Sequence, residues 1–245
     1  MRLLIDLGNT RLKWALANPD GTLSNMQALV ASADPSCWRV LIEHLSTRAI
    51  DQIALSSVAG ASTQALLAVL KQQLPDTKIL QAQSLAYCAG VTSGYHLPNT
   101  LGVDRFLALL GAFSNCANTQ VIAMLGTALT IDVLHASGNH AGGLIAPGPR
   151  LMQTSLHLGT ANLPLTEGRA GGLGQTTADA IFSGCQRACA ALIEAVLQDF
   201  PGASLVLSGG AAPQVAPLLK HPGKIVPNLV LLGLQKFADS AESSQ

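Results

Sequence analysis

Apolar positions in the first half of the chain change between the spacing of strands and the spacing of helices. Continuous or alternating apolar residues predict a strand, whereas apolar residues three and four apart predict a helix that buries one face. The turn residues Gly8-Asn9-Thr10 separate the first two expected strands. By these patterns we expect strands over residues 3–7, 13–17 and 52–58, helices over 36–47, 63–74 and 103–113, and a loop over 94–100. Strands that alternate with helices indicate an α/β fold.

The second half of the chain repeats the opening pattern. An apolar run over 121–125 leads into Gly126-Thr127 and then into a second run over 129–134, which echoes the strand, turn and strand of the N-terminus. Further along we expect a long helix over 178–199, a strand over 204–207, a last helix beginning at 229–234 and a polar, frayed tail over 238–245. The pattern breaks at 115–118, so we predict two subdomains, over 1–115 and 116–245, packed closely around a cleft.

Composition and charge exclude several classes of protein. Hydrophobic residues make up 49% of the chain and charged residues 11%, which is too apolar for intrinsic disorder. Lys and Arg number 14 and so do Asp and Glu, so no net charge favours nucleic acid or an anionic membrane. The apolar stretches 106–113 and 229–234 are far shorter than the roughly 20 residues that span a bilayer. Asp6 interrupts the N-terminal apolar run before it reaches the length of a signal peptide.

The cysteines and histidines predict no metal or redox site. The 5 cysteines are scattered without a CxxC pair, and the 6 histidines show no HxH or HExxH spacing. Cys185 and Cys189 lie one helical turn apart, where small buried apolar side chains are the simplest interpretation. We therefore expect a cytoplasmic protein, and so little surface charge on so apolar a chain also favours self-association.

The first candidate for chemistry is the segment Asp6-Leu7-Gly8-Asn9-Thr10-Arg11-Leu12-Lys13. A glycine in a tight turn lets backbone amides approach a phosphate, Asn and Thr side chains add donors, and a carboxylate at a strand end can hold Mg²⁺. The alternative is an ordinary Gly-Asn hairpin turn with a solvent-facing Asp. The second turn, at Gly126-Thr127, favours the nucleotide interpretation, because two such turns in facing halves can hold a polyphosphate from both sides.

The second candidate is Gly102-Val103-Asp104-Arg105, at the start of the helix expected over 103–113 and after a loop that contains Tyr95. A carboxylate at a helix N-terminus can orient or deprotonate a hydroxyl, and an arginine can bind a carboxylate or a phosphate. The alternative is a plain helix cap. A glycine-rich loop, Gly142 to Gly148, carries no charge and either lets backbone approach a ligand or joins two strands.

Taken in order, these motifs resemble those of type III pantothenate kinases. The set comprises Asp6-x-Gly8-Asn9-Thr10, Gly102-x-Asp104-Arg105, Gly126-Thr127-Ala128-x-Thr130, Gly142-Gly143 to Pro147-Gly148, and Ser208-Gly209-Gly210. The resemblance spans essentially the whole chain. It implies membership of the acetate and sugar kinase, heat-shock 70 and actin superfamily, in which two ribonuclease-H-like subdomains bind ATP between them.

The resemblance implies an ATP-dependent kinase that phosphorylates pantothenate to 4'-phosphopantothenate, the first step of coenzyme A biosynthesis. By the family's motifs, Asp6 to Lys13 would form the first phosphate loop with Asp6 near Mg²⁺, and Thr127 would contact ATP from the second half. Asp104 would be the catalytic base. The pantothenate pocket would be lined by Tyr95, Gly102, Val103, Asp104, Arg105 and Thr177, and a partner in a homodimer would complete it.

The chain departs from the family pattern at two positions. Family members usually have an Asp two residues before the glycine of the Gly-Thr-Ala turn, where it binds a monovalent cation, K⁺ or NH₄⁺, and here that residue is Met124. A thioether cannot replace a carboxylate for a hard cation, so either the enzyme needs no K⁺ or another oxygen supplies the ligand. The acidic residue that the family has after the late Gly-Gly is also absent, since Ala211 follows Gly210.

Two alternative functions stay open. The departures at Met124 and Ala211 motivate a non-catalytic regulatory or accessory protein that has kept the nucleotide-binding fold. Against it, Asp6, Asp104 and Thr127 persist, and a protein freed from catalysis has no physical need for that combination. The other alternative is a related kinase that acts on another small alcohol.

Overall fold

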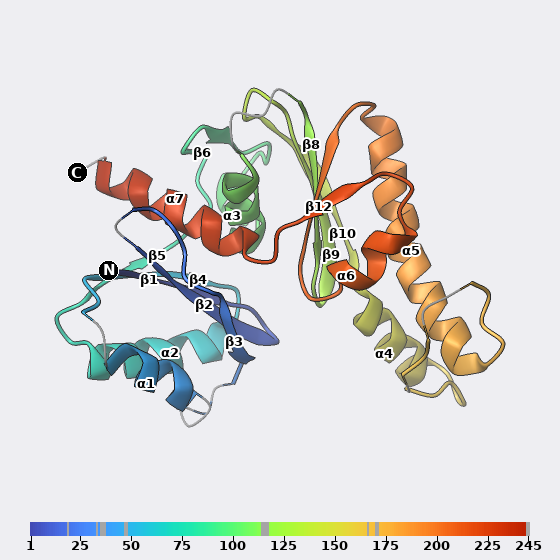
Figure 1. Cartoon of the computed structure of the whole chain (residues 1–245), viewed down its shortest axis with the longest axis horizontal. Helices are drawn as coiled ribbons and strands as arrows, with labels where there is room; N and C mark the ends of the chain where they lie inside the picture. Colours follow the sequence, from blue (N-terminus) through green and yellow to red (C-terminus); the bar gives the residue numbers. More distant parts are fainter. Residues whose placement is uncertain are drawn as a thin grey trace. The chain divides into compact units, whose positions relative to one another are not determined.

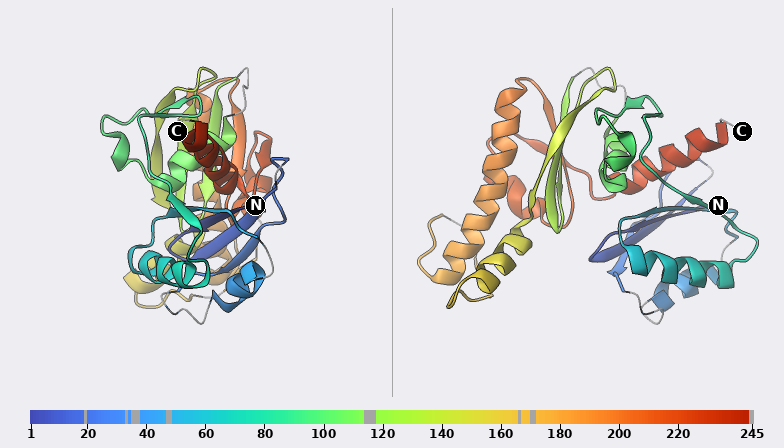
Figure 2. Two further views of the ribbon diagram at one scale, coloured as in Figure 1. Left: turned by 90° about the vertical axis from the view of Figure 1, so that its left-hand side faces the viewer. Right: turned by 180° about the vertical axis from the view of Figure 1, so that it is seen from behind.

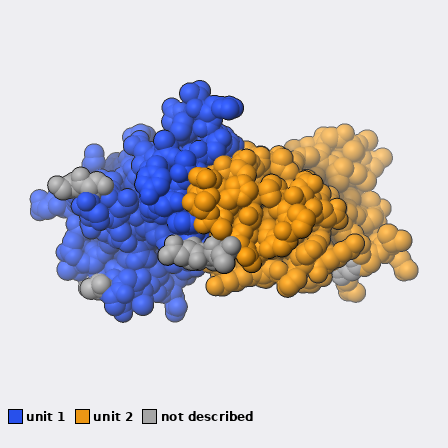
Figure 3. Space-filling model, turned by 90° about the horizontal axis from the view of Figure 1, so that it is seen from above, with its two compact units in different colours: residues 1–113, 228–245 blue, residues 114–227 orange. Residues whose placement is uncertain are grey.

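The protein divides into two compact units, which Figure 3 shows in blue and orange. A computed structural model describes residues 1–18, 20–32, 34, 38–46, 49–113, 118–165, 167–169 and 172–243. Unit 1 comprises residues 1–113 and 228–245, and unit 2 comprises residues 114–227. These units differ from the expected subdomains, 1–115 and 116–245, chiefly in helix α7 (Leu229–Ser243), which packs within unit 1.

Unit 1 contains a five-stranded sheet in the order β3-β2-β1-β4-β5 (Figure 1). Its strands are β1 (Arg2–Leu7), β2 (Arg11–Ala17), β3 (Gln27–Val30), β4 (Gln52–Ser57) and β5 (Lys78–Gln81). Successive side chains of a strand point to opposite faces. Leu3, Ile5 and Leu7 of β1 enter a core that is covered by α1 (Arg39–Ser46) and α2 (Gly60–Gln73). Asp6 therefore belongs to the other face, where α3 (Val103–Ala112) and α7 pack.

Unit 2 contains a second five-stranded sheet, in the order β10-β9-β8-β11-β12. Its strands are β8 (Gln120–Leu125), β9 (Ala128–Leu134), β10 (His140–Pro147), β11 (Ser204–Ser208) and β12 (Gly223–Ile225). Helix α5 (Thr177–Asp199) buries Cys189, Ile193 and Leu197 against this sheet, and α4 (Pro149–Gly159) packs beside α5, as the right view of Figure 2 shows. By length and composition alone α5 would pass as a membrane span, with 44% of its apolar segment buried inside the protein, and one such helix is weak evidence for a membrane segment.

The remaining described elements are short. They are β6 (Tyr87–Cys88), β7 (Val91–Thr92), α6 (Ala212–Val215) and the 3₁₀ turns Pro98–Thr100 and Ala216–Leu218. β6 and β7 form a small antiparallel hairpin whose turn holds Gly90 at φ +89.

The two sheets repeat one topology. In each, the first three strands are antiparallel neighbours and the last two run parallel to the first, so β8 to β12 correspond to β1 to β5. The repeat of a strand, a turn and a strand that the sequence shows in both halves therefore extends to the whole sheet. The α/β prediction is confirmed. By this correspondence Asp6, two residues before Gly8, matches Met124, two residues before Gly126.

Some expected elements were wrong. Residues 142–147 were expected in a glycine-rich loop, but they lie in β10, with a bulge between His140 and Gly142. Glycines carry no apolar alternation, so pairing with β9 left no signal in the sequence. The tail after residue 238 was expected to fray, but α7 continues to Ser243, and Arg2 forms ion pairs with Asp239 and Glu242.

Two sequence-based expectations fall partly outside the described residues. The helix expected over 36–47 is present as α1 from Arg39, whereas Ser36, Cys37 and Thr47 are not described. Asn115 and Cys116, at the expected domain boundary, are also outside the described residues.

Candidate functional site

The turn between β1 and β2 contains the first group of candidate residues. Leu7 pairs with Leu12 across the strands, and the Gly8 N–H donates to the Arg11 carbonyl at 3.0 Å. Both leucines are fully buried, whereas Asn9, Thr10 and Arg11 are exposed. The apolar residues of this motif thus fix the turn to the sheet, and its polar residues face solvent.

Asp6 lies next to the end of β1, directly across from Lys13 on β2. Burial is the largest cause that raises the pKa of Asp6 to about 6; the charge of Lys13 lowers this pKa, and the charge of Asp104 raises it further. The carboxylates of β1 and α3 are therefore close enough to repel each other. Hard oxygen donors of this kind fit a divalent cation, which takes one or two carboxylates and completes its shell with phosphates and water.

Asp104 lies in the first turn of α3 and is half-buried. Its Oδ1 accepts a hydrogen bond from the Arg105 backbone N–H at 2.9 Å. A Cβ on Gly102, the N-cap residue, would come within 2.8 Å of this Oδ1. Glycine at position 102 therefore leaves the space that the carboxylate occupies, and the first turn of a helix is a favourable place for a negative charge.

The Arg105 side chain is directed to Tyr95. Arg105 is only 4% exposed, and its Nη1 donates to the Tyr95 hydroxyl at 2.7 Å. Arg105 thus contacts both candidate residues: its backbone N–H holds Asp104 and its guanidinium group holds Tyr95. Tyr95, Val103, Asp104 and Arg105, which the sequence placed in one substrate site, are together at the start of α3.

The second turn, between β8 and β9, lies in unit 2. The Gly126 N–H donates to the Ala128 carbonyl at 3.0 Å, and Thr127 is exposed. Two glycines from other loops pack onto the start of this turn. The Gly148 N–H donates to the Thr127 carbonyl at 2.9 Å, and a Cβ on Gly148 would overlap the Gly126 carbonyl oxygen. Gly209 has φ +94 and lies against the Leu125 backbone.

These contacts give a physical reason for the glycines at positions 148 and 209, to which the sequence motifs assigned no contact. Gly148 and Gly209 are far apart in the chain, so only the fold shows that both meet the same turn. The sequence also missed a buried pair in unit 2, in which His140 Nε2 lies 2.9 Å from Asp132 Oδ1 across β9 and β10. Pairs between strands leave no spacing signal in a sequence.

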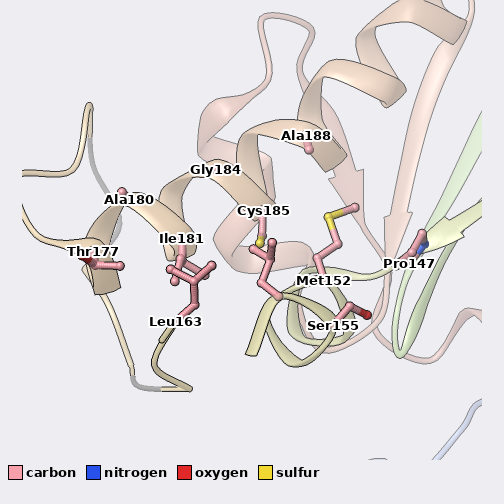
Figure 4. A pocket seen from close by; sticks show the side chains of 11 residues that line it. Pro147, Met152, Ser155, Leu163, Thr177, Ala180, Ile181, Gly184, Cys185 and Ala188 are labelled. Atoms are coloured by element: carbon pink, nitrogen blue, oxygen red, sulfur yellow. The ribbon is translucent and has the colours of Figure 1, made fainter. Parts of the chain in front are cut away.

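Thr177 is the first residue of α5, after its N-cap Thr176. It lines a pocket of about 730 Å³ between α4 and α5, shown in Figure 4 with Thr177 and Pro147 near opposite ends. Most of the lining is apolar and includes Met152, Leu156, Leu163, Ile181 and Cys185. Thr177 and Thr127 thus belong to unit 2, whereas Asp6, Tyr95 and Asp104 belong to unit 1.

Met124 has no carboxylate among the residues that pair with it across the sheet. Met124 pairs with Thr130 on β9 and with Ser208 on β11. The Thr130 hydroxyl is buried and has no hydrogen-bond partner among the described residues. A thioether and two hydroxyls lack the anionic oxygen that a hard cation prefers. Nor does the described part of the chain bring three or more His, Cys, Asp or Glu side chains together as a metal site.

Comparison with known proteins agrees with the motifs. The profile of the type III pantothenate kinase family matches residues 2–199. A type III pantothenate kinase of Aromatoleum aromaticum is 40% identical over 241 residues, which cover 97% of this chain and 98% of the relative. One from Xanthomonas campestris is 38% identical and covers 96% of each chain.

A solved structure supports the fold. A Baf family transcriptional activator from Campylobacter jejuni superposes with a TM-score of 0.61 and 21% identity, covering 98% of this chain and 99% of the other. The expected fold of two ribonuclease-H-like subdomains is confirmed by this likeness and by the repeated strand order. Since the family profile covers most of the chain and a close relative matches nearly all of it, this chain belongs to the type III pantothenate kinase family.

Proposed function

We propose that this protein is an ATP-dependent kinase that transfers the γ-phosphate of ATP to the primary hydroxyl of pantothenate. The product is 4'-phosphopantothenate, and the reaction is the first step of coenzyme A biosynthesis. The observation that carries the proposal is the start of α3, where Asp104 is held near Asp6 and beside a buried Arg105. The relatives that share 38–40% identity along nearly the whole chain bear the name of this activity.

Phosphoryl transfer requires positioning and charge stabilisation more than covalent chemistry. In our proposal the turn from Asp6 to Lys13 binds the phosphates from unit 1, and Thr127 contacts ATP from unit 2. Asp6 holds Mg²⁺, which neutralises phosphate charge when bound with ATP. Asp104 orients the acceptor hydroxyl and accepts its proton.

The pantothenate site comprises Tyr95, Thr177 and the turn from Gly102 to Arg105. The buried guanidinium of Arg105, fixed by Tyr95, is suited to an anionic group of the substrate, since pantothenate carries a carboxylate. Thr177 lies at the N-terminus of α5 and lines the pocket of unit 2. We propose that a second copy of the chain completes this site.

A homodimer is supported by exposed apolar side chains on unit 2. Ile145 is 65% exposed on β10, an edge strand of its sheet, and Leu158 is 78% exposed on α4. Leu144 and Leu156 on the same two elements are also exposed. Large apolar side chains this exposed can serve as a contact surface, and unpaired edge strands are normally protected.

We infer that the reaction needs no monovalent cation, because Met124 and its neighbours offer no carboxylate. We also place the enzyme in the cytoplasm. The described cysteines, Cys88, Cys185 and Cys189, are free and buried, as expected in a reducing compartment.

The regulatory alternative has weaker support. The Campylobacter jejuni protein is called a transcriptional activator, but a likeness at 21% identity supports the fold alone. Asp6 and Asp104, brought near each other in unit 1, and the exposed polar turn after Asp6 are what a phosphotransferase requires. A kinase for another small alcohol would use the same groups, so the acceptor must be tested directly.

The deciding experiment is a coupled ADP-release assay on the purified protein with ATP, Mg²⁺ and pantothenate. It is run in parallel with K⁺, with Na⁺ and with neither ion, and with other primary alcohols in place of pantothenate. We expect ADP release that depends on pantothenate and is equal with K⁺, with Na⁺ and with neither ion. Folded protein that binds ATP without turnover would contradict the kinase proposal, and turnover only with another alcohol would contradict the acceptor. Stimulation by K⁺ alone would contradict the inference from Met124.

A further inference from the structure

Helix α7 packs against α3, the helix whose first turn contains Asp104 and Arg105. The two helices come from opposite ends of the chain, and α7 lies beyond the residues that match the family profile. No side chain caps the N-terminus of α3. Contacts along the rest of the helix therefore add to the Arg105–Tyr95 hydrogen bond in setting the position of its first turn.

Glycines bring the two helix backbones into direct contact. A Cβ on Gly233 of α7 would overlap the Leu107 carbonyl oxygen of α3, and a Cβ on Gly111 would overlap the Leu229 carbonyl oxygen. No side chain separates the helices at this crossing, so the distance between their axes is fixed by backbone. Leu107 is three residues after Asp104 and lies on the same side of α3. A displacement at the crossing would consequently move Asp104.

Lys236 holds the other end of α3. Its Nζ donates to the Leu110 carbonyl at 2.9 Å and also to the Phe113 carbonyl. The last carbonyls of a helix have no partner within the helix, and a positive charge at this end is favourable. A helix of ten residues is about 15 Å long. Lys236 is therefore too far from the first turn to act on substrate and is suited to fixing α3 along its axis.

We propose that Lys236 and Gly233 are positioning residues, through which α7 sets the axial position and depth of α3 and hence the place of Asp104 and Arg105. The proposal rests on the proposed function, in which Asp104 is the base. Lys236 satisfies the free carbonyls at the end of α3, and Gly233 sets how closely the helix approaches. Neither residue contacts the reacting groups.

The first test compares Lys236→Met, which keeps the length of the side chain but removes its donors, with Lys236→Arg, which restores them. A misplacement of about 1 Å at a reacting group can cost about 100-fold in rate. We expect Lys236→Met to lower kcat by about 10- to 100-fold. The KM for ATP should change little, because the phosphate turn belongs to the sheet. Lys236→Arg should recover most of kcat.

A second measurement reports the position of α3 without any activity. The chain has 2 tyrosines, so ¹³C-labelling of tyrosine gives one signal from Tyr95 and one from Tyr87. Tyr95 accepts a hydrogen bond from Arg105 and so senses the first turn of α3, whereas Tyr87 is 64% exposed and serves as the internal reference. We expect the Tyr95 signal to shift in Lys236→Met and to return in Lys236→Arg, with Tyr87 unchanged.

Glycine variants test the crossing itself. Gly233→Ala should move the Tyr95 signal and lower kcat, and Gly60→Ala in α2, where an added Cβ meets nothing within 4 Å, is the matched control. If Gly233→Ala does not fold, the Lys236 variants, which leave the crossing intact, still decide the proposal.

A folded Lys236→Met variant with wild-type kcat and an unmoved Tyr95 signal would overturn the proposal. An equal loss of activity in Lys236→Met and Lys236→Arg, with the Tyr95 signal unmoved, would also overturn the proposal, because it would show that Lys236 only stabilises the fold. An inactive wild type would contradict the proposed function, while the Tyr95 signal would still test the positioning of α3.

Discussion

Asp6 is half-buried, and its surroundings disfavour the charge of its carboxylate. Its pKa is raised to about 6, chiefly by burial, so near neutral pH the protein holds a charge in a place that disfavours it. A cation bound with ATP would offset this cost. Destabilising groups of this kind are typical of functional sites, where stability is lost for activity.

The pH dependence follows from the direction of this shift. Between the ordinary value of 3.8 and about 6, folded protein keeps the Asp6 proton that unfolded protein releases, so stability falls as pH rises through this window. Asp6→Asn should therefore raise the thermal midpoint of the unliganded protein at pH 8, with a much smaller gain at pH 4, and should abolish turnover. Thermal denaturation at the two pH values checks this. An Asn variant that is less stable at pH 8 would show that Asp6 is not penalised by burial.

Asp104 is the residue that we propose as the catalytic base. Asp104→Asn preserves size and hydrogen bonding at the start of α3 but cannot accept a proton at neutral pH. We expect turnover to fall by roughly 10²- to 10⁴-fold, the usual contribution of a general base, while the fold and ATP binding are retained. Steady-state kinetics and calorimetric ATP titration measure both. Near-normal turnover would remove Asp104 from the role of base.

The sequence identified Asp6, Asp104 and Arg105 as candidates because their motifs are contiguous. It did not show that Arg105 bonds to Tyr95, since the partners of a side chain depend on the fold around it. Nor did it show that Asp6 and Asp104 are neighbours, because they come from a strand and a helix that are distant in the chain.

At the scale of elements, central strands were predicted well and edge strands poorly. β1, β4 and β8 are buried on both faces and read as apolar runs. β3 and β5, at the edges, have exposed or half-buried residues and no such run. Pairing with a neighbour, which a sequence does not display, is what makes these segments strands.

The turn between β8 and β9 depends on a close approach by the loop before α4. Gly148→Ala would place a methyl group against the Gly126 carbonyl oxygen. The positions of both are fixed by the backbone, so no side-chain rotation relieves the overlap. We expect a loss of about 1–3 kcal/mol in stability and a higher KM for ATP, because Thr127 moves with the turn.

Gly159→Ala is the matched control for this variant. Gly159 ends α4, and an added Cβ there meets nothing within 4 Å. Denaturation by urea and steady-state kinetics compare the two. Equal stability and an equal KM for ATP in both variants would show that the Gly148 contact does not hold the turn.

At the scale of the whole molecule, we expect a dimer because unit 2 exposes large apolar side chains such as Ile145 and Leu158. Ile145→Asp places a charge on the exposed edge strand β10 without touching a buried residue. We expect the wild type to be a dimer by light scattering and the variant to be a monomer with reduced turnover, since the second copy that completes the site would be lost. Val30→Asp, 73% exposed on β3, the corresponding strand of unit 1, is the control and should stay dimeric. A wild-type monomer with full activity would contradict the dimer.

The sequence also divided the molecule differently from the contacts. A boundary near residue 115 follows from the break in the apolar pattern, but the return of α7 to unit 1 depends on Gly111, Gly233 and Lys236, which meet only in the fold. A sequence does not show which partner a glycine or a single lysine in a helix contacts.

The return of α7 also has a consequence for biosynthesis. Unit 1 is interrupted after residue 113 and resumes at 228, with all of unit 2 between. A ribosome adds roughly 5–20 residues per second, so unit 2 can leave the exit tunnel and fold while α3 still lacks its partner helix. The nascent chain therefore acquires an ordered phosphotransferase centre only once α7 has emerged, and a chain released early would carry every proposed catalytic residue yet be inactive.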